Sequence, residues 1–304
     1  MSEKSLGRGA GNNRRIESLP VRTQFLIFTL FGDYVLEKSG KIWTSSLLYL
    51  MSLLDVSERA VRSTLSRMTK KGWIIPERYG RRSQYSLSDQ GRTLLERGQR
   101  RIFEPTFTRW DKRWHIITYS LPNAYRPIRH TLRTQLAWLG FGSLAPGTWI
   151  SPHNRAEELE SLIEDLDIGS FVDMFSGTYL GPSVSIELAQ RCWDLPAIEA
   201  QYQKFVNRYQ KEYQELYNKG KGAPLLSREE CFIRRFWLTH MFQSFPLKDP
   251  NLPPELLPPD WIGITARKLF DNYHKLLGNY ANQFVDEVIS GVNVKEEDQE
   301  PIRI

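Results

Sequence analysis

Residues 57–72 constrain the fold of this chain more than any other stretch, because they divide into two distinct faces. Apolar or small side chains recur at the three- and four-residue spacing that buries one stripe of a helix: Ala60, Val61, Thr64, Leu65 and Met68. The other face carries Arg59, Arg62, Ser63, Ser66, Arg67 and Lys70. Ser57 with Glu58 is typical of a helix start, and Gly72 of a helix end. The pattern predicts a helix that packs with one face and presents hydrogen-bond donors with the other.

The flanking segments predict a helix-turn-helix followed by a basic hairpin. A helix is expected from Val21 to about Gly40, and a second one, capped by Ser45, extends to the break at Asp55-Val56. Residues 73–75 and 84–87 are typical of short strands, and the turn between them, 79–82, contains Arg81 and Arg82. A helix is expected from residue 88 to about 101. This order predicts a winged helix-turn-helix domain over residues 20–105.

Charge is distributed unevenly along the chain. Residues 1–110 contain 20 Lys and Arg against 10 Asp and Glu, whereas residues 111–304 contain 21 against 25. A basic excess confined to the N-terminal part indicates a polyanion partner for that part, with nucleic acid as the first candidate. A solvated basic face without a partner is the alternative. Residues 1–19 are polar and Gly/Arg-rich, and they predict a disordered basic arm.

The exposed face of the 57–72 helix supplies the candidate DNA-contacting residues. Arg59, Arg62, Ser63, Ser66, Arg67 and Lys70 are the candidates on the helix, and Arg81 with Arg82 are those in the hairpin. Arg62 is the best candidate for a bidentate contact with guanine, which is typically worth about 1–3 kcal/mol of discrimination. The hairpin arginines are better placed for phosphate or minor-groove contacts. An ordinary amphipathic surface helix is the alternative for this segment.

The rest of the chain predicts two further domains. Strands expected at 114–119, 142–144, 148–150 and 170–178, with helices at 124–139 and 154–166, give the order βαββαβ of a ferredoxin-like sandwich over residues 106–182. Helices expected at 195–218, 227–245 and 261–277 predict a helical C-terminal domain over residues 183–290, followed by a frayed tail at 291–304. The expected fold class is therefore a multi-domain α+β protein.

Cysteine content and hydropathy indicate a cytoplasmic protein with no membrane partner. Cys192 and Cys231 are the only two cysteines, too few for the disulfide framework of a small secreted domain or for a Cys-rich zinc site. No stretch approaches the ~18 uninterrupted apolar residues of a membrane span. The sequence also lacks H-E-x-x-H, G-x-S-x-G and Walker motifs, so we expect no catalytic residues, no metal site and no enzyme activity.

Several motifs along residues 20–285 together carry a family resemblance. They are Leu26-Ile27-Phe28-Thr29-Leu30-Phe31-Gly32-Asp33-Tyr34, Ile42-Trp43, Glu58-Arg59-Ala60-Val61-Arg62, Gly72-Trp73, Gly80-Arg81-Arg82-Ser83-Gln84-Tyr85, Leu139-Gly140-Phe141-Gly142, Pro146-Gly147-Thr148-Trp149-Ile150, Asp249-Pro250-Asn251-Leu252-Pro253 and Leu256-Leu257-Pro258 before Trp261. With these motifs the chain resembles the PaaX family, repressors of phenylacetic acid degradation operons.

The resemblance implies a winged-helix N-terminal domain, a central domain similar to Cas2 and a helical C-terminal domain in a homodimer. It also implies double-stranded operator DNA as partner, and release from that DNA by an aryl-CoA thioester, typically phenylacetyl-CoA. A CoA thioester needs cations for its phosphates and an apolar slot for its aryl group. The candidate cations are Arg126, Arg129 and Arg133 in the middle domain, and Arg234 with Arg235 beside two aromatic residues. Solvated or ion-paired arginines are the alternative for both groups.

Two alternative functions accompany the repressor hypothesis. The first is the same regulator fold responding to another CoA thioester or to no ligand. The second is a metal-dependent nuclease built on the central domain. Cas2-like nucleases place an acidic residue at the end of their first strand, whereas this strand ends Thr118-Tyr119-Ser120-Leu121-Pro122. Without a carboxylate there, metal-assisted cleavage has no evident ligand, and we expect the fold without the nuclease.

Overall fold

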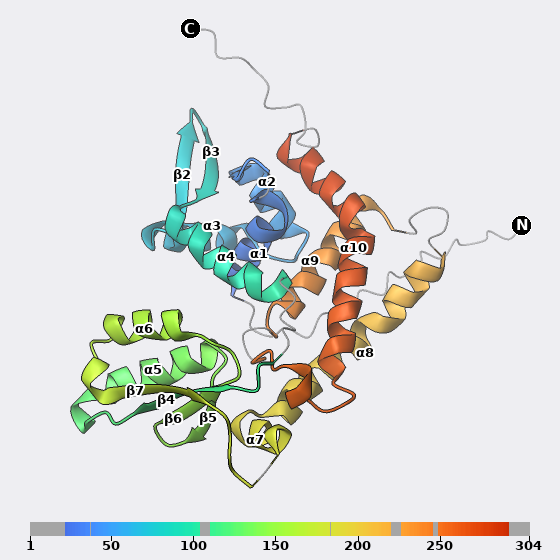
Figure 1. Cartoon of the computed structure of the whole chain (residues 1–304). Coiled ribbons are helices and arrows are strands. Elements are labelled where there is room, and N and C mark those ends of the chain that lie inside the picture. Colours follow the sequence, from blue (N-terminus) through green and yellow to red (C-terminus); the bar gives the residue numbers. More distant parts are fainter. Residues whose placement is uncertain are drawn as a thin grey trace, which may run out of the picture.

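The computed structural model describes residues 22–36, 38–103, 110–182, 184–219, 226–245 and 249–291. The basic arm expected at 1–19 and all but the first residue of the tail expected at 291–304 lie outside these segments. The chain forms an N-terminal part with a small sheet, a central sandwich and a set of C-terminal helices (Figure 1). Within the described segments, no helix combines the length and the hydropathy that spanning a lipid bilayer requires.

The N-terminal part contains four α-helices and a three-stranded antiparallel sheet. Its elements are α1 (Thr23–Leu30), the π-helical η1 (Phe31–Val35), β1 (Lys41–Trp43), α2 (Thr44–Ser52), α3 (Glu58–Lys70), β2 (Ile74–Tyr79), β3 (Arg82–Leu87) and α4 (Asp89–Phe103). The strand order is β1-β3-β2. The α3 helix begins and ends where local signals predict it. The Ser57 side chain accepts a hydrogen bond from the backbone N–H of Ala60 at 3.3 Å, and Gly72 has the left-handed φ of +70° that ends the helix.

Three local details of this part differ from the sequence expectations. The first helix ends through a π-helical turn at Val35, short of Gly40. The second helix begins at Thr44, directly after β1, so Ser45 lies inside the helix and is not its cap. The Thr44 hydroxyl donates to the backbone carbonyl of Ser83 at 2.8 Å, which ties the helix start to β3. The strand β1 was not expected, because three residues are too few to show a period of two.

The central part is a four-stranded antiparallel sheet with two helices on one face (Figure 1). Its elements are β4 (Trp114–Tyr119), α5 (Arg126–Trp138), β5 (Gly142–Ala145), β6 (Thr148–Ser151), α6 (Ala156–Asp165) and β7 (Val172–Gly177), with short 3₁₀ turns at Asn123–Tyr125 and Gly169–Phe171. The strand order is β5-β6-β4-β7. The order βαββαβ therefore matches the expectation. A separate core, which includes Ile117, Leu132 and Leu159, fills the space between sheet and helices.

The C-terminal part is helical, with two differences from the expectation. Its elements are α7 (Ser185–Cys192), α8 (Leu195–Lys219), α9 (Arg228–Phe242), a 3₁₀ turn (Pro254–Leu256) and α10 (Ile262–Ile289). The helix α7 was not expected. The last helix continues past Leu277, where the sequence expectation ended it. Gly278 costs a helix about 1 kcal/mol relative to Ala, but the burial of Phe284, Val285 and Val288 further along offsets that cost.

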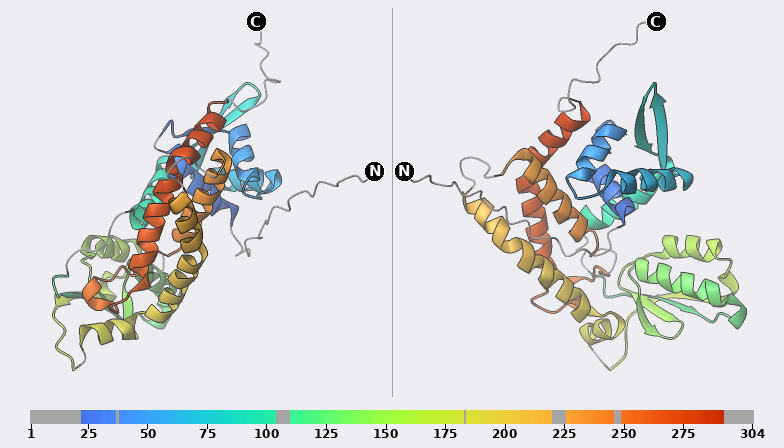
Figure 2. Two further views of the ribbon diagram at one scale, coloured as in Figure 1. Left: turned by 90° about the vertical axis from the view of Figure 1, so that its right-hand side faces the viewer. Right: turned by 180° about the vertical axis from the view of Figure 1, so that it is seen from behind.

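The N-terminal and C-terminal parts share one hydrophobic core. The α1 helix packs against α9, and α2 packs against α10, as both views in Figure 2 show. The buried Ser46 hydroxyl on α2 donates to the backbone carbonyl of Val288 on α10 at 2.9 Å. Lys38 also forms an ion pair with Asp286. The C-terminal helices therefore fix the position of the N-terminal part, including α3, relative to the rest of the chain.

Candidate nucleic-acid interface

The α3 helix presents all six of its candidate side chains on one side. Arg59, Arg62, Ser63, Ser66, Arg67 and Lys70 are all exposed, and they recur at positions three and four apart. Val61, Thr64, Leu65 and Met68 on the opposite side are buried. The buried apolar face of α3 and the face that carries hydrogen-bond donors are thus separate, as the sequence predicted. This division lets a helix enter a major groove while its other side remains on its own core.

Two of these arginines make weak contacts within the helix. The Arg62 Nε donates to the Glu58 carboxylate at 2.6 Å, and the two side chains are 57% and 64% exposed. An exposed pair of this kind contributes about 0–1 kcal/mol, so a phosphate or a base edge can displace Glu58 at little cost. The Arg67 guanidinium donates to the Thr64 hydroxyl at 2.9 Å. Both contacts hold cations at the surface of α3.

The β2–β3 hairpin places the other two candidate arginines at its tip. Tyr79 pairs with Arg82, and Gly80 takes the left-handed φ of +61° that the turn requires. Arg81 and Arg82 are both exposed. The hairpin projects from the body of the N-terminal part (Figure 1). Four exposed arginines and lysines on α3 and two arginines on the hairpin therefore belong to the same small domain.

The hairpin is braced near its tip from β1, a strand that the sequence did not predict. Glu77 accepts hydrogen bonds from the Lys41 ammonium at 2.8 Å and from the Tyr79 hydroxyl at 2.7 Å. The bond from Lys41 is the main reason why the pKa of Glu77 lies below its ordinary value. The Tyr79 ring also meets Trp43 edge-on, with 5.6 Å between ring centroids. These contacts hold β2 of the hairpin against β1.

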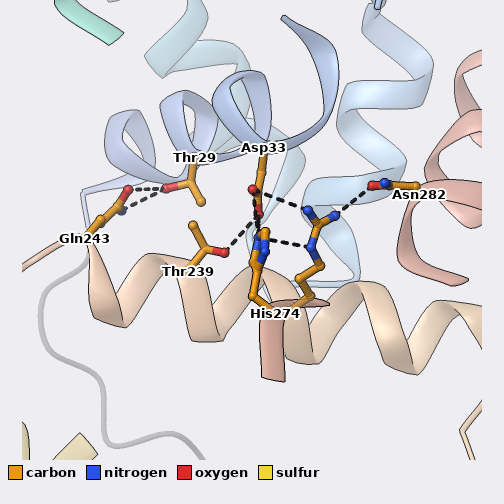
Figure 3. Close-up of polar contacts among 7 residues, drawn as sticks. Thr29, Asp33, Thr239, Gln243, His274 and Asn282 are labelled. Atoms are coloured by element: carbon orange, nitrogen blue, oxygen red, sulfur yellow. Dashed lines mark hydrogen bonds and ion pairs between the residues drawn. The ribbon is translucent and has the colours of Figure 1, made fainter. Parts of the chain in front are cut away.

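A buried polar cluster joins the N-terminal part to the C-terminal helices (Figure 3). We call it the Asp33 cluster; its members are Asp33 of η1, Arg235 and Thr239 of α9, and His274 and Asn282 of α10. The Thr239 hydroxyl donates to Asp33 at 2.9 Å, and the Arg235 guanidinium lies 3.7 Å from the same carboxylate. Arg235 also donates to the Asn282 side chain at 2.7 Å. The cluster therefore links three elements across the interface between the two parts.

The electrostatics of the cluster favour a charged Asp33. Burial alone would raise the pKa of Asp33, but the hydrogen bonds from His274 and Thr239 and the charge of Arg235 outweigh burial and lower it. The His274 Nε2 lies 3.1 Å from the Asp33 carboxylate and 3.0 Å from the Arg235 Nε, which is a donor. The Nε2 atom donates to Asp33 when it carries a proton, and it accepts from Arg235 when it does not. A lone Asp within the apolar run 25–35 was the available sequence signal for this site.

The arginines that the sequence favoured for an effector lie in two separate places. On α5, Arg126 and Arg133 are exposed, whereas Arg129 donates to the backbone carbonyl of Leu121 at 2.5 Å. On α9, Arg234 forms an ion pair with Glu212 of α8, and Arg235 belongs to the Asp33 cluster. The structure does not bring the two groups into one site.

Burial shifts the pKa values of both cysteines and of His240. Burial raises the pKa of both Cys192 and Cys231 to about 11, so both thiols keep their protons near neutral pH. Burial lowers the pKa of His240 to about 4. At the end of β4, the carboxylate paired across the strands is Asp173 of β7, opposite Thr118. Among the residues with described positions, no group of three or more His, Cys, Asp or Glu side chains is arranged to hold a metal ion.

Comparisons with known proteins place these features in a family. Residues 22–91 match the family described as PaaX-like protein, residues 108–189 match PaaX protein central Cas2-like domain, and residues 193–287 match PaaX-like protein C-terminal domain. The chain is 32% identical to "Transcriptional repressor PaaX" of Escherichia coli (strain K12) over 275 residues, which is 90% of this chain and 85% of that protein. A solved structure, "Uncharacterized protein Rv0674 from Mycobacterium tuberculosis", shares the fold with a TM-score of 0.57 at 22% identity, covering 87% of this chain and 98% of that one.

Proposed function

Because the chain belongs to the PaaX family, we propose that it is a cytoplasmic transcriptional repressor whose N-terminal part is a winged helix-turn-helix that binds operator DNA. The observation that carries the proposal is the exposed cationic stripe of α3, backed by a buried apolar stripe and followed by a hairpin with two arginines at its tip. The element order, with a short turn between α2 and α3 and the hairpin directly after, supports the same conclusion.

In this proposal α3 enters the major groove and the hairpin follows the backbone. Arg62 takes a guanine edge after leaving Glu58, and Arg59, Ser63, Ser66 and Arg67 share the recognition face. Lys70, Arg81 and Arg82 meet phosphates or the minor groove. Phosphate contacts set the position of the protein on the duplex, and base contacts select the sequence.

We also propose that the protein binds DNA as a homodimer, as the family resemblance implies. A twofold axis relates two copies of the same surface and presents two α3 helices to half-sites about one helical turn apart, roughly 34–36 Å. We further propose that an aryl-CoA thioester such as phenylacetyl-CoA releases the dimer from a phenylacetate catabolic operon.

A binding titration tests the proposal. The full chain is titrated onto the DNA upstream of its own gene at several fixed salt concentrations, with and without phenylacetyl-CoA, and free phenylacetate and CoA serve as ligand controls. Tight, salt-sensitive binding that the thioester alone abolishes is the expected result. If the thioester does not change binding to the DNA, the effector is removed from the proposal. If the protein does not bind this DNA specifically, the proposal as a whole is refuted.

Three arginine variants sharpen this test. Arg62→Ala should weaken binding to the operator and relax its specificity, with a loss of about 1–3 kcal/mol. Arg82→Ala should weaken binding to all sequences alike and lower the salt slope by about one. Arg133→Ala removes an exposed arginine of the central part and should leave operator binding unchanged. An Arg62→Ala variant that binds the operator like the parent would show that α3 is not the recognition helix.

A further inference from the structure

A cavity of about 510 Å³ lies in the central part, away from α3 and from the Asp33 cluster. Its lining comes from the segment before β4, from β4 and β7, and from the first turns of α6. The lining includes Asp111, Arg113, Arg155, Leu159, Met174 and Ser176. The volume falls within the range of about 300–1,000 Å³ that small-molecule sites occupy.

Two guanidinium groups give the cavity its charge. The Arg113 side chain is held in place by Ser176, with its Nε 3.2 Å from the Ser176 hydroxyl and its Nη2 3.2 Å from the Ser176 carbonyl. Arg155 directly precedes α6 and donates through Nη1 to Glu158 at 3.0 Å. The Nε of Arg155 is buried and has no hydrogen-bond partner within the described segments. An unused buried donor is costly unless a ligand or water meets it.

The surrounding groups favour an anion with an apolar portion. The N-terminus of α6, which adds a partial positive charge, lies beside Arg155, and its first turn also carries Glu157 and Glu158. His115 lines the cavity as well, and Asp111 is its single described acidic lining residue. Leu159 is buried, and Met174 is 39% exposed, so an apolar surface lies beside the cations. Phosphate groups fit the guanidinium groups, and an apolar chain fits the surface beside them.

The place of the cavity in the chain connects it to the DNA-binding part. Asp111 and Arg113 lie on the segment through which the chain passes from α4 to β4. A ligand that bridges Arg113 and Arg155 therefore joins this segment to α6 of the central part. The cavity thus lies beside the connection between the N-terminal part and the central part.

We propose that this cavity binds the phosphate-bearing end of the effector, a CoA thioester, through Arg113 and Arg155, with the apolar portion of the ligand lying along Leu159 and Met174. The inference rests on the proposed function, because it assigns a site to the effector of that function. It places the site apart from the arginines that the sequence favoured. Of those, Arg235 is committed to the Asp33 cluster and Arg129 to the Leu121 carbonyl.

Isothermal titration of the full-length protein with CoA, phenylacetyl-CoA and phenylacetate tests the assignment. We expect the parent to bind CoA and phenylacetyl-CoA but not phenylacetate, because the phosphates supply the contacts to Arg113 and Arg155. Arg113→Ala and Arg155→Ala should each weaken binding of both CoA compounds by about tenfold or more. The matched control is Arg191→Ala on α7, at an exposed arginine outside the cavity lining, which should bind like the parent.

A second variant separates the loss of a contact from a general loss of structure. Met174→Trp fills the cavity from an exposed position and keeps both guanidinium groups, so it should weaken thioester binding while the melting temperature and ligand-free operator binding stay at parental values. If Arg113→Ala, Arg155→Ala and Met174→Trp all bind the thioester like the parent, the site is elsewhere, and the repressor proposal stands. If the parent binds no CoA compound and still binds the operator, the effector and this site both fail, and the DNA-binding proposal alone remains.

Discussion

Replacing Arg235 with Met removes the cation from the Asp33 cluster and keeps an apolar stem of similar length. The Asp33 side chain is 4% exposed, so its carboxylate stays out of water after the guanidinium has gone. Removing one partner of a buried ion pair costs about 3–5 kcal/mol of the free energy of unfolding. Thr239 and His274 still contact the carboxylate, so we expect the lower end of that range, about 3 kcal/mol.

The neighbouring Arg234 provides a matched control. Its ion pair with Glu212 joins side chains that are 37% and 30% exposed, so solvent screens it. Arg234→Met should therefore cost no more than about 1 kcal/mol. Urea unfolding of the parent and the two variants, followed by circular dichroism, measures both losses. Because the cluster joins η1 to α9 and α10, hydrogen exchange in Arg235→Met should also rise at this interface before it rises in the central part.

A double-mutant cycle isolates the contact between the two charges. Asp33→Asn combined with Arg235→Met removes both charges, and the coupling between the two changes should be about 0.5–3 kcal/mol. If Arg235→Met loses no more stability than Arg234→Met, or if the two changes add without coupling, then the Asp33 cluster does not hold the N-terminal part to the C-terminal helices.

Three further predictions concern packing, capping and pH. Gly142→Ala would place a methyl group 2.5 Å from the Trp193 ring and should lower the free energy of unfolding by about 1–3 kcal/mol, as measured by thermal unfolding. The control Gly177→Ala, whose methyl group has no described atom within 4 Å, should change the free energy of unfolding little. Ser57→Ala removes the cap of α3 and should cost about 1 kcal/mol, seen as a lower urea midpoint. Burial lowers the pKa of His240 to about 4 from an ordinary ~6.5, so the unfolded chain takes up a proton at a higher pH than the folded chain does. The free energy of unfolding should therefore fall as the pH drops from about 6.5 to about 4. His240→Gln should make this decline shallower.

Each of these predictions has a result that contradicts it. Equal melting temperatures for the Gly142 and Gly177 variants would mean that the Trp193 ring moves aside freely. An unchanged midpoint for Ser57→Ala would mean that water replaces the cap at no cost; Ser63→Ala, at an exposed position on the same helix, shows the effect of losing a hydroxyl alone. A decline with pH that persists in His240→Gln would assign it to other groups, and His130→Gln at an exposed site is the control.

The elements that the sequence predicted best are those specified by neighbouring residues. The α3 helix has its cap, its end and both of its faces within 57–72, and the structure confirms all of them. The four strands of the central sheet were also predicted within two residues at each end, because their apolar runs are bounded by Gly and Pro. Local signals suffice where the partners of a residue lie a few positions away.

The features that the sequence missed depend on residues far away in the chain. The strand β1 exists because residues 41–43 pair with 84–86, and nothing within three residues indicates such pairing. The continuation of α10 past Gly278 depends on packing against α9 and α2. The Asp33 cluster joins residues more than 200 positions apart. Nothing near Asp33 in the sequence identifies Arg235 as its partner, and Arg235 was assigned instead to a possible ligand.

The core that the two ends of the chain share has a consequence for biosynthesis. The helices α1 and α2 leave the ribosome early, yet α9 and α10, which cover their apolar surface, are made last. At a translation rate of ~5–20 residues per second, the N-terminal part waits roughly ten to fifty seconds for these helices. During this interval its apolar surface is open to chaperones and to other nascent chains. A ribosome that stalls before residue 262 would therefore release an N-terminal part whose interior is incomplete. Such a fragment is a substrate for proteolysis and cannot replace the whole repressor.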